Sequence, residues 1–191
     1  MGEAGMTVDL DGKFFRVIGL GGAVVDAVTE VLRSNGAQAT ASAGDILIAA
    51  FPLLPEADFD PIRLSSDAEA MATNGGGRIV VLLSAMASVP MRRHVEYSAG
   101  MAAAVTQVRG LAMQFGPKLL VNAIGCGLIE GDGALLSGDP QMLTHVPLGH
   151  PGSIEDVSDA VLFLCDPLNS YTTGQILMVD GGWSPGYGRN F

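Results

Sequence analysis

The sequence has few charged residues, two lysines and two cysteines. Cys126 and Cys165 are too few for a disulfide framework or a metal-ligand cluster, and the three histidines are scattered. The longest apolar run, 46–54, contains a proline and is far shorter than a membrane-spanning helix. The first residues contain neither the basic nor the apolar segment of an export signal. These absences predict a cytoplasmic protein with no metal site and no membrane span.

Acidic residues outnumber basic residues by 20 to 10, which gives a net charge of −10. This sign argues against nucleic acid and anionic membranes as partners. Only 16% of the residues are charged, compared with about 25% in an ordinary soluble domain. On a folded monomer of this size, the deficit corresponds to roughly 3,000 Å² of charge-poor surface, which is in the range of obligate interfaces. We therefore expect a permanent subunit of an assembly.

Apolar runs of strand length alternate with segments of helical period, a pattern typical of a parallel α/β sheet. The length of 191 residues favours one domain, 1–191. Strands are predicted at 14–19, 45–50, 78–84, 119–124 and 175–180. Helices are predicted to end at residue 34, to run from Asp60-Pro61 to about residue 74, to span 95–115, and to follow a capping box at 153–156. A Gly-rich loop is expected at 125–149.

Two long motifs in the second half of the chain carry a family resemblance. Residues 97–127 read YSAGMAAAVTQVRGLAMQFGPKLLVNAIGCG, and residues 147–183 read PLGHPGSIEDVSDAVLFLCDPLNSYTTGQILMVDGGW. The chain closely resembles the short-chain dehydrogenase/reductases over roughly 76–183, and in degraded form over 11–50. The resemblance implies a doubly wound Rossmann-like fold, an NAD(P) cofactor and a Ser-Tyr-Lys catalytic group.

The catalytic group that the resemblance implies is incomplete. Ser84 and Tyr97 have the family's spacing of thirteen residues, but Met101 stands one helical turn after Tyr97, where the family has lysine. In the family, that lysine lowers the pKa of the tyrosine and binds the nicotinamide ribose. Lys13 and Lys118 lie elsewhere, before the first predicted strand and at the start of the fourth. We therefore interpret Ser84 and Tyr97 as vestigial, with no catalytic group intact.

The cofactor site that the resemblance implies is also degraded. Of the three glycines in the family's first loop only Gly19 is kept, because Ala23 and Val25 stand at the other two positions. Such glycines allow the backbone to approach a pyrophosphate closely. The motif on the adenine side reads AAFP at 49–52, in which apolar groups replace hydrogen-bonding ones. We expect no intact NAD(P) site in this chain.

The chain is short where the family binds adenosine. Only ten residues, 35–44, separate the first helix from the strand at 45–50, where the family has two strands and two helices. Because parallel strands need a crossover of a dozen or more residues, we predict a truncated sheet of about five parallel strands. Their order is 1-4-5-6-7 in the family's numbering, with the adenosine-side strands lost. The first strand, with Phe14 and Phe15, becomes an edge that a partner or the N-terminal segment should cover.

These observations lead to the hypothesis of a non-catalytic structural subunit, a pseudoenzyme, in a hetero-oligomeric NAD-dependent short-chain alcohol or hydroxyacyl-CoA dehydrogenase. The active partner, an intact paralogue in a heterotetramer, would hold NAD(H) and act on a secondary alcohol. Contacts are expected through the helix at 95–115 and the C-terminal region 153–191. The aromatic tail, 183–191, is a candidate for shaping the partner's pocket.

Two alternatives remain open at this stage. The first is a cofactor-free lyase, isomerase or dehalogenase that uses Ser84 and Tyr97. It needs a positive charge near the tyrosine, which Arg92, Arg93 or Arg109 would have to supply. The second is a sensor or regulator that has kept the fold and lost the chemistry.

Overall fold

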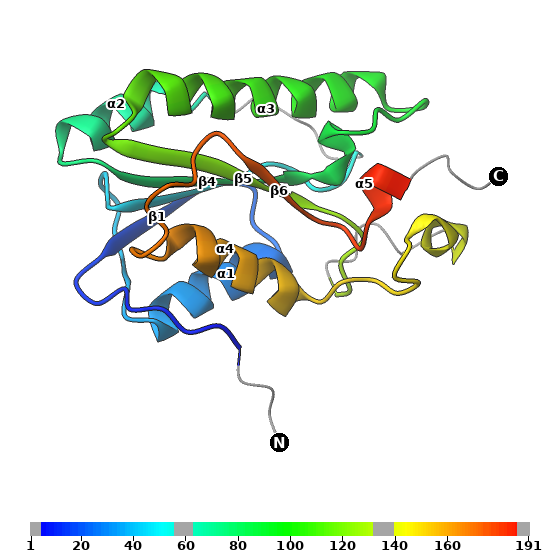
Figure 1. Ribbon diagram of the computed structural model, residues 1–191, viewed down its shortest axis with the longest axis horizontal. Helices are drawn as coiled ribbons and strands as arrows, with labels where there is room; N and C mark the ends of the chain where they lie inside the picture. The colour runs from blue at the N-terminus through cyan, green and yellow to red at the C-terminus, as the bar shows by residue number, and fades with distance from the viewer. Residues whose placement is uncertain (1–4, 56–62, 132–139, 187–191) are drawn as a thin grey trace.

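The chain forms one parallel sheet with helices on both faces (Figure 1). The computed structural model describes residues 5–55, 63–131 and 140–186. The strands are β1 (Phe14–Gly19), β2 (Gln38–Ala39), β3 (Ile46–Ala50), β4 (Gly77–Ser84), β5 (Leu119–Cys126) and β6 (Ile176–Val179). The helices are α1 (Ala23–Ser34), α2 (Ser65–Thr73), α3 (Val95–Phe115), α4 (Ile154–Cys165) and α5 (Trp183–Gly186), with short 3-10 helices η1 (Ala85–Ala87) and η2 (Pro140–His145).

The predicted α/β class and the doubly wound arrangement are confirmed. The strand order is β2-β1-β3-β4-β5-β6, and every neighbouring pair is parallel. Helices α1 and α4 cover one face of the sheet, and α2 and α3 cover the other (Figure 1). The bounds of β1 and α3 are those predicted from the sequence. The expected helix start at Asp60-Pro61 lies outside the described residues, but residues 63–64 are not helical, so the predicted extent is wrong and α2 begins only at Ser65. Its end before Asn74 is as predicted.

The prediction of about five strands is wrong by one. Gln38 and Ala39 form β2 and pair with Phe14 and Phe15. β2 has only two residues and pairs with the first two residues of β1, and β3 begins opposite Phe15, at the same end of β1. The end of β2 and the start of β3 therefore lie close together along the strand direction. A short link past the start of β1 is therefore sufficient, and the crossover length of full strands does not apply. One strand on the adenosine side is shortened rather than lost.

The aromatic pair at the start of β1 is divided between core and surface. The side chain of Phe15 is buried, whereas that of Phe14 is 45% exposed. β2 covers this part of the β1 edge, and Val8 and Leu10 of the N-terminal segment are buried in the same cluster as Phe15. The chain itself thus covers the start of the edge. Beyond Phe15, no described strand pairs with β1 on that side.

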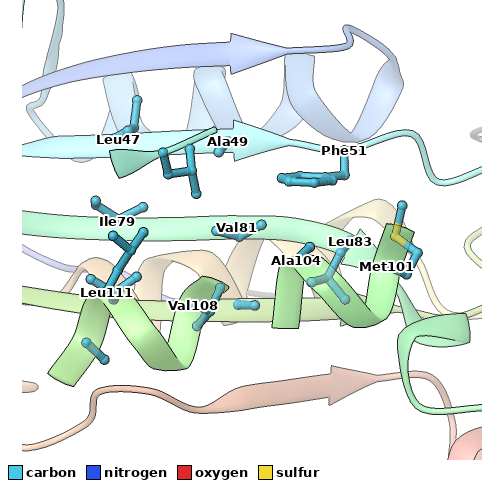
Figure 2. Close-up of a cluster of buried hydrophobic side chains, with 14 of the residues drawn as sticks. Leu47, Ala49, Phe51, Ile79, Val81, Leu83, Met101, Ala104, Val108 and Leu111 are labelled. Atoms are coloured by element: carbon cyan, nitrogen blue, oxygen red, sulfur yellow. The ribbon is translucent and has the colours of Figure 1, made fainter. Parts of the chain in front are cut away.

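Strand β4 shows how the sheet divides the core into two layers. Ile79, Val81 and Leu83 belong to the cluster under α2 and α3, while Val80 and Leu82 belong to the cluster over α1 and α4. Successive side chains of a strand point to opposite faces, so a strand with helices on both sides is apolar throughout. Figure 2 shows the first cluster, in which side chains from β3, β4 and α3 meet.

Polar contacts fix both ends of α4. The predicted capping box is present, because the Ser153 hydroxyl accepts from the Asp156 N–H and the Asp156 carboxylate accepts from the Ser153 N–H. At the other end, the Arg78 guanidinium donates to the carbonyl of Leu164 in the last turn at 3.4 Å, and to that of Asn169, beyond the helix, at 2.9 Å. Burial lowers the pKa of Arg78 and raises that of the Cys165 thiol to about 12. Cys165 is therefore a protonated core residue at neutral pH.

The remaining expectations concern the loop at 125–149 and membrane spans. Gly125 and Cys126 belong to β5, residues 140–145 form η2, and residues 132–139 lie outside the described part of the chain. None of the helices in the described ranges is both long and apolar enough to cross a membrane. Within the same ranges, no three side chains of the metal-binding types gather into a cluster.

Candidate functional site

The strand order places a crevice at the carboxyl ends of β1 and β3. From β1 the chain passes to β2 on one side, and β3 lies on the other side, so the winding reverses between them. Ligands of open α/β sheets bind at such reversal points, beyond the carboxyl ends of the strands. Ser84 ends β4 at the same edge of the sheet. The candidate catalytic and cofactor positions therefore belong to one region of the fold.

Ser84 is completely buried and is used for capping. Its hydroxyl accepts a hydrogen bond from the Met86 N–H at 3.3 Å, which starts η1. The cavity beside Ser84 has a volume of about 10 Å³, and Met86 and Trp183 are among the side chains that line it. A cavity of that size holds about one water molecule. Trp183 is thus buried at a cavity of this chain, whereas 187–191 of the tail lie outside the described residues.

Tyr97 lies in the first turn of α3, and its side chain is also buried. Its hydroxyl donates to the backbone carbonyl of Pro52 at 2.6 Å. Pro52 follows β3, so this hydrogen bond ties α3 to the loop at the carboxyl end of that strand. Tyr97 is not among the residues that line the Ser84 cavity. The two positions that share the family's spacing therefore make separate structural contacts.

Met101 is fully buried in the cluster between α3 and the sheet. Figure 2 shows its side chain beside Leu83 of β4, with Phe51 at the end of β3 in the same cluster. A methionine in this position adds apolar packing and no positive charge. The position that carries lysine in the family is thus part of the core.

The arginines and lysines considered from the sequence lie at several places in the described part of the chain. Arg109 lies twelve residues further along α3, which is about 18 Å along the helix axis. Arg92 and Arg93 are exposed before α3 begins. Lys13 pairs with Asp45 at 3.6 Å, at the amino-terminal side of β1 and β3. Lys118 precedes β5 and donates to the carbonyl of Ala72, so it lies at the same amino-terminal side of the sheet.

The crevice between the start of α1 and the loop after β3 has a volume of about 280 Å³. Gly19 ends β1 with φ +100°, Ala23 begins α1, and the half-buried side chain of Val25 lines the crevice. The eleven described residues that line it are all Gly, Ala, Val, Leu, Phe or Pro. Among these residues, no side chain could bond a pyrophosphate or a ribose hydroxyl.

The second strand does not compensate for this loss. In dinucleotide-binding folds, an acidic residue about twenty positions after the glycine loop binds the adenosine ribose. Here β2 ends at Ala39 and is followed by Thr40. Among the described residues, the crevice therefore offers NAD(P) no polar or charged side chain.

Sequence analysis identified the substituted positions but missed two contacts. The Pro52 carbonyl that receives the Tyr97 hydroxyl is a backbone atom, so residue identity gives no signal of it. Trp183, which lines the cavity beside Ser84, follows a turn at Asp180, whose carboxylate accepts from the N–H groups of Gly182 and Ser184. An acidic residue before two glycines was the available signal for that turn.

Comparisons with known proteins agree with the fold and with the motifs. Residues 60–184 match the family described as enoyl-(acyl carrier protein) reductase. The chain is 38% identical over 120 residues to the 7alpha-hydroxysteroid dehydrogenase of Escherichia coli (strain K12), covering 60% of this chain and 47% of that protein. It is 39% identical over 110 residues to the 3-oxoacyl-(acyl-carrier-protein) reductase FabG of Aquifex aeolicus (strain VF5), covering 56% and 44%.

A solved structure extends the similarity over most of the chain. It is a 7 alpha-hydroxysteroid dehydrogenase complexed with NADH and 7-oxo glycochenodeoxycholic acid. The TM-score is 0.73 at 25% identity, over 91% of this chain and 95% of that chain. The fold thus defines a Rossmann-like α/β protein of the dinucleotide-binding type. More narrowly, the chain belongs to the short-chain dehydrogenase/reductase family, and its matches span just under half the length of the two sequence relatives.

Proposed function

We propose that this chain is a non-catalytic structural subunit of a hetero-oligomeric short-chain dehydrogenase. An intact paralogue would hold NAD(H) and carry out the chemistry, while this chain holds none. The observation that carries the proposal is the hydrogen bond from the buried Tyr97 hydroxyl to the Pro52 carbonyl at 2.6 Å. It is joined by the buried Met101, which stands one helical turn later in place of a lysine. A tyrosine hydroxyl engaged in this way, with a methionine where the family has its lysine, is poorly suited to transfer a proton to a substrate.

The names of the relatives suggest the chemistry of the partner. They are an alcohol dehydrogenase acting on a steroid and a reductase acting on a 3-oxoacyl group. Both names fit the oxidation of a secondary alcohol or the reverse reaction. We propose a hydroxyacyl-CoA or similar secondary alcohol as the substrate of the complex. The arrangement would be similar in kind to the inactive subunit of the hydroxybenzylsuccinyl-CoA dehydrogenase of anaerobic toluene degradation, and cytoplasmic.

The exposed face of α3 supports one partner contact. Val95 and Met113 are 65% and 80% exposed at its two ends. The residues exposed between them are mostly small, namely Ala99, Ala102, Ala103 and Thr106. Small side chains allow a second helix to approach closely. This face is the proposed contact of the 95–115 helix with the active paralogue.

A second exposed apolar surface lies within 153–191. Leu168 and Tyr171, between α4 and β6, are 89% and 101% exposed, and Leu177 of β6 is 38% exposed. β6 is the last strand in the order, so its outer edge has no strand neighbour among the described residues. Exposed apolar patches and open edges of this kind favour association. We propose this surface as the second contact in a heterotetramer.

The alternative of a cofactor-free enzyme is less well supported. It requires Ser84 and Tyr97 to face a common substrate, yet both hydroxyls make internal hydrogen bonds. It also requires a nearby cation, and Arg109 is about three turns of helix away. The geometry therefore favours the structural subunit.

The experiment is a kinetic test on the assembly purified from the natural host. The variants Tyr97→Phe and Ser84→Ala remove the two hydroxyls without adding bulk. We expect kcat and KM for NAD-linked alcohol oxidation to stay within twofold of the unmodified assembly. A fall of a hundredfold or more in kcat, the size of a lost general acid, with the assembly intact by size-exclusion chromatography, would contradict the proposal.

A further inference from the structure

We infer that the crevice at the ends of β1 and β3 binds a small, uncharged, apolar molecule, aromatic or hydrocarbon, in place of a nucleotide. The crevice keeps the position that the fold gives to a ligand, while its chemistry is that of an apolar pocket. The inference concerns this chain alone. It does not depend on the presence or identity of a partner subunit.

The floor of the crevice is buried and apolar. Val24, Ala50 and Leu82 have relative exposures of 2% or less and come from α1, β3 and β4. The backbone N–H of Leu20 bonds the carbonyl of Ala50, and the N–H of Phe51 bonds the carbonyl of Leu82. These two N–H groups are therefore used within the sheet and are not available to a ligand.

The rim is also apolar, and part of it is exposed. The side chain of Leu20 is 46% exposed beside the opening, and Val25 and Leu53 are half-buried in the lining. An apolar ligand would remove this surface from water, which is favourable. A phosphate or carboxylate would lose its hydration here without gaining a charged partner. None of the described lining side chains is charged, so the side chains themselves favour an uncharged ligand.

The volume sets the size of the ligand. An apolar cavity of about 150 Å³ accommodates benzene, and this crevice measures about 280 Å³. A molecule somewhat larger than benzene, such as naphthalene or a short acyl chain, fits that space. The hydrogen bond from Tyr97 to Pro52 holds one wall in place. The pocket is therefore formed before the ligand arrives, as is usual for small-molecule sites.

Naphthalene is the probe that tests the inference. It is titrated into the full chain, alone or in the assembly with which it purifies, and binding is followed by saturation-transfer NMR. The test variant is Val25→Glu, and the matched control is Val31→Glu. Both valines are half-buried on α1 and pack against the same cluster, but only Val25 lines the crevice. A second test variant, Gly21→Trp, adds bulk at the rim, where a Cβ would meet no atom within 4 Å.

We expect saturable binding that weakens at least tenfold in Val25→Glu and Gly21→Trp and less than twofold in Val31→Glu. Millimolar NAD(H) should not displace the probe from this chain. Absence of saturable binding, or equal weakening in Val31→Glu, would overturn the inference. Neither result would bear on the kinetic test of the structural-subunit proposal, because that test reads NAD-linked turnover of the assembly.

Discussion

The replacement of a charged side chain by methionine at position 101 alters both the electrostatics and the packing around Tyr97. A lysine there would need water, a counter-charge or a bound cofactor near its ammonium group. Met101 instead lies beside Leu83 in a fully buried cluster. The neighbouring polar group has adapted as well, since the Tyr97 hydroxyl bonds a backbone carbonyl. Met101 and the hydrogen bond of Tyr97 are therefore both part of the packed core.

The first prediction concerns the variant Met101→Lys, which restores the residue type of the family. We expect it to lower the free energy of unfolding by about 3 kcal/mol or more, because it buries a charge among apolar side chains. It should not create NAD-linked activity in this chain. Thermal or urea unfolding monitored by circular dichroism measures the change.

The matched control is Met113→Lys on the same helix, where the side chain is 80% exposed. It should change the free energy of unfolding by no more than about 0.5 kcal/mol. Equal stability of the two variants would show that position 101 still accommodates a cation, and the account of Tyr97 would fail with it.

At the scale of residues, the sequence alone showed which motif residues are substituted, but not which contacts the substituted positions make in the fold. Met101, Ala23 and Val25 are visible as departures from a spaced motif. The contacts that these positions make instead depend on tertiary packing. The bond from Tyr97 joins positions 45 residues apart and ends on a backbone atom, so no local pattern encodes it.

At the scale of elements, the two-residue strand β2 is what allows the chain to pass from α1 to β3 in few residues. β2 supplies two residues of pairing at the start of β1. The Gln38 N–H donates to the Lys13 carbonyl at 2.9 Å, and the Thr40 N–H donates to the Phe15 carbonyl at 2.8 Å. These bonds cover the part of the edge where the aromatic pair lies. A link of six residues then leads to β3.

The second prediction tests this strand through Gln38→Pro. Proline removes the N–H that bonds Lys13, so we expect a loss of about 1–3 kcal/mol of stability. Gln38→Ala is the control, because the glutamine side chain is exposed and its removal should be nearly neutral. Hydrogen exchange should also show faster exchange at Thr40 in the proline variant. Equal stability of the two variants would remove β2 from the account of the fold.

The strands and helices were predictable where their apolar period is long. The bounds of α3, the position of β4 and the capping box of α4 follow from patterns of residues close in sequence. The two-residue β2 has no such pattern, because two exposed residues form no period. Its existence depends on pairing with β1. The crossover rule misled us here because it applies to strands of ordinary length.

At the scale of the whole molecule, the low content of charged residues and the exposed apolar side chains both favour association with a partner. The chain has 16% charged residues and a net charge of −10. Its large exposed apolar side chains include Val95 and Met113 on α3, and Leu168 and Tyr171 between α4 and β6. These are the two regions from which we predicted partner contacts. Such surfaces suit a permanent subunit better than a free monomer.

The most direct measurement is native mass spectrometry of this chain, affinity-tagged and purified from its own host. We predict a second, longer chain of the same family at fixed stoichiometry, with NAD(H) bound to that chain. Isolation of this chain as a stable homo-oligomer that binds NAD(H) and turns over an alcohol would contradict the central claim of a non-catalytic subunit.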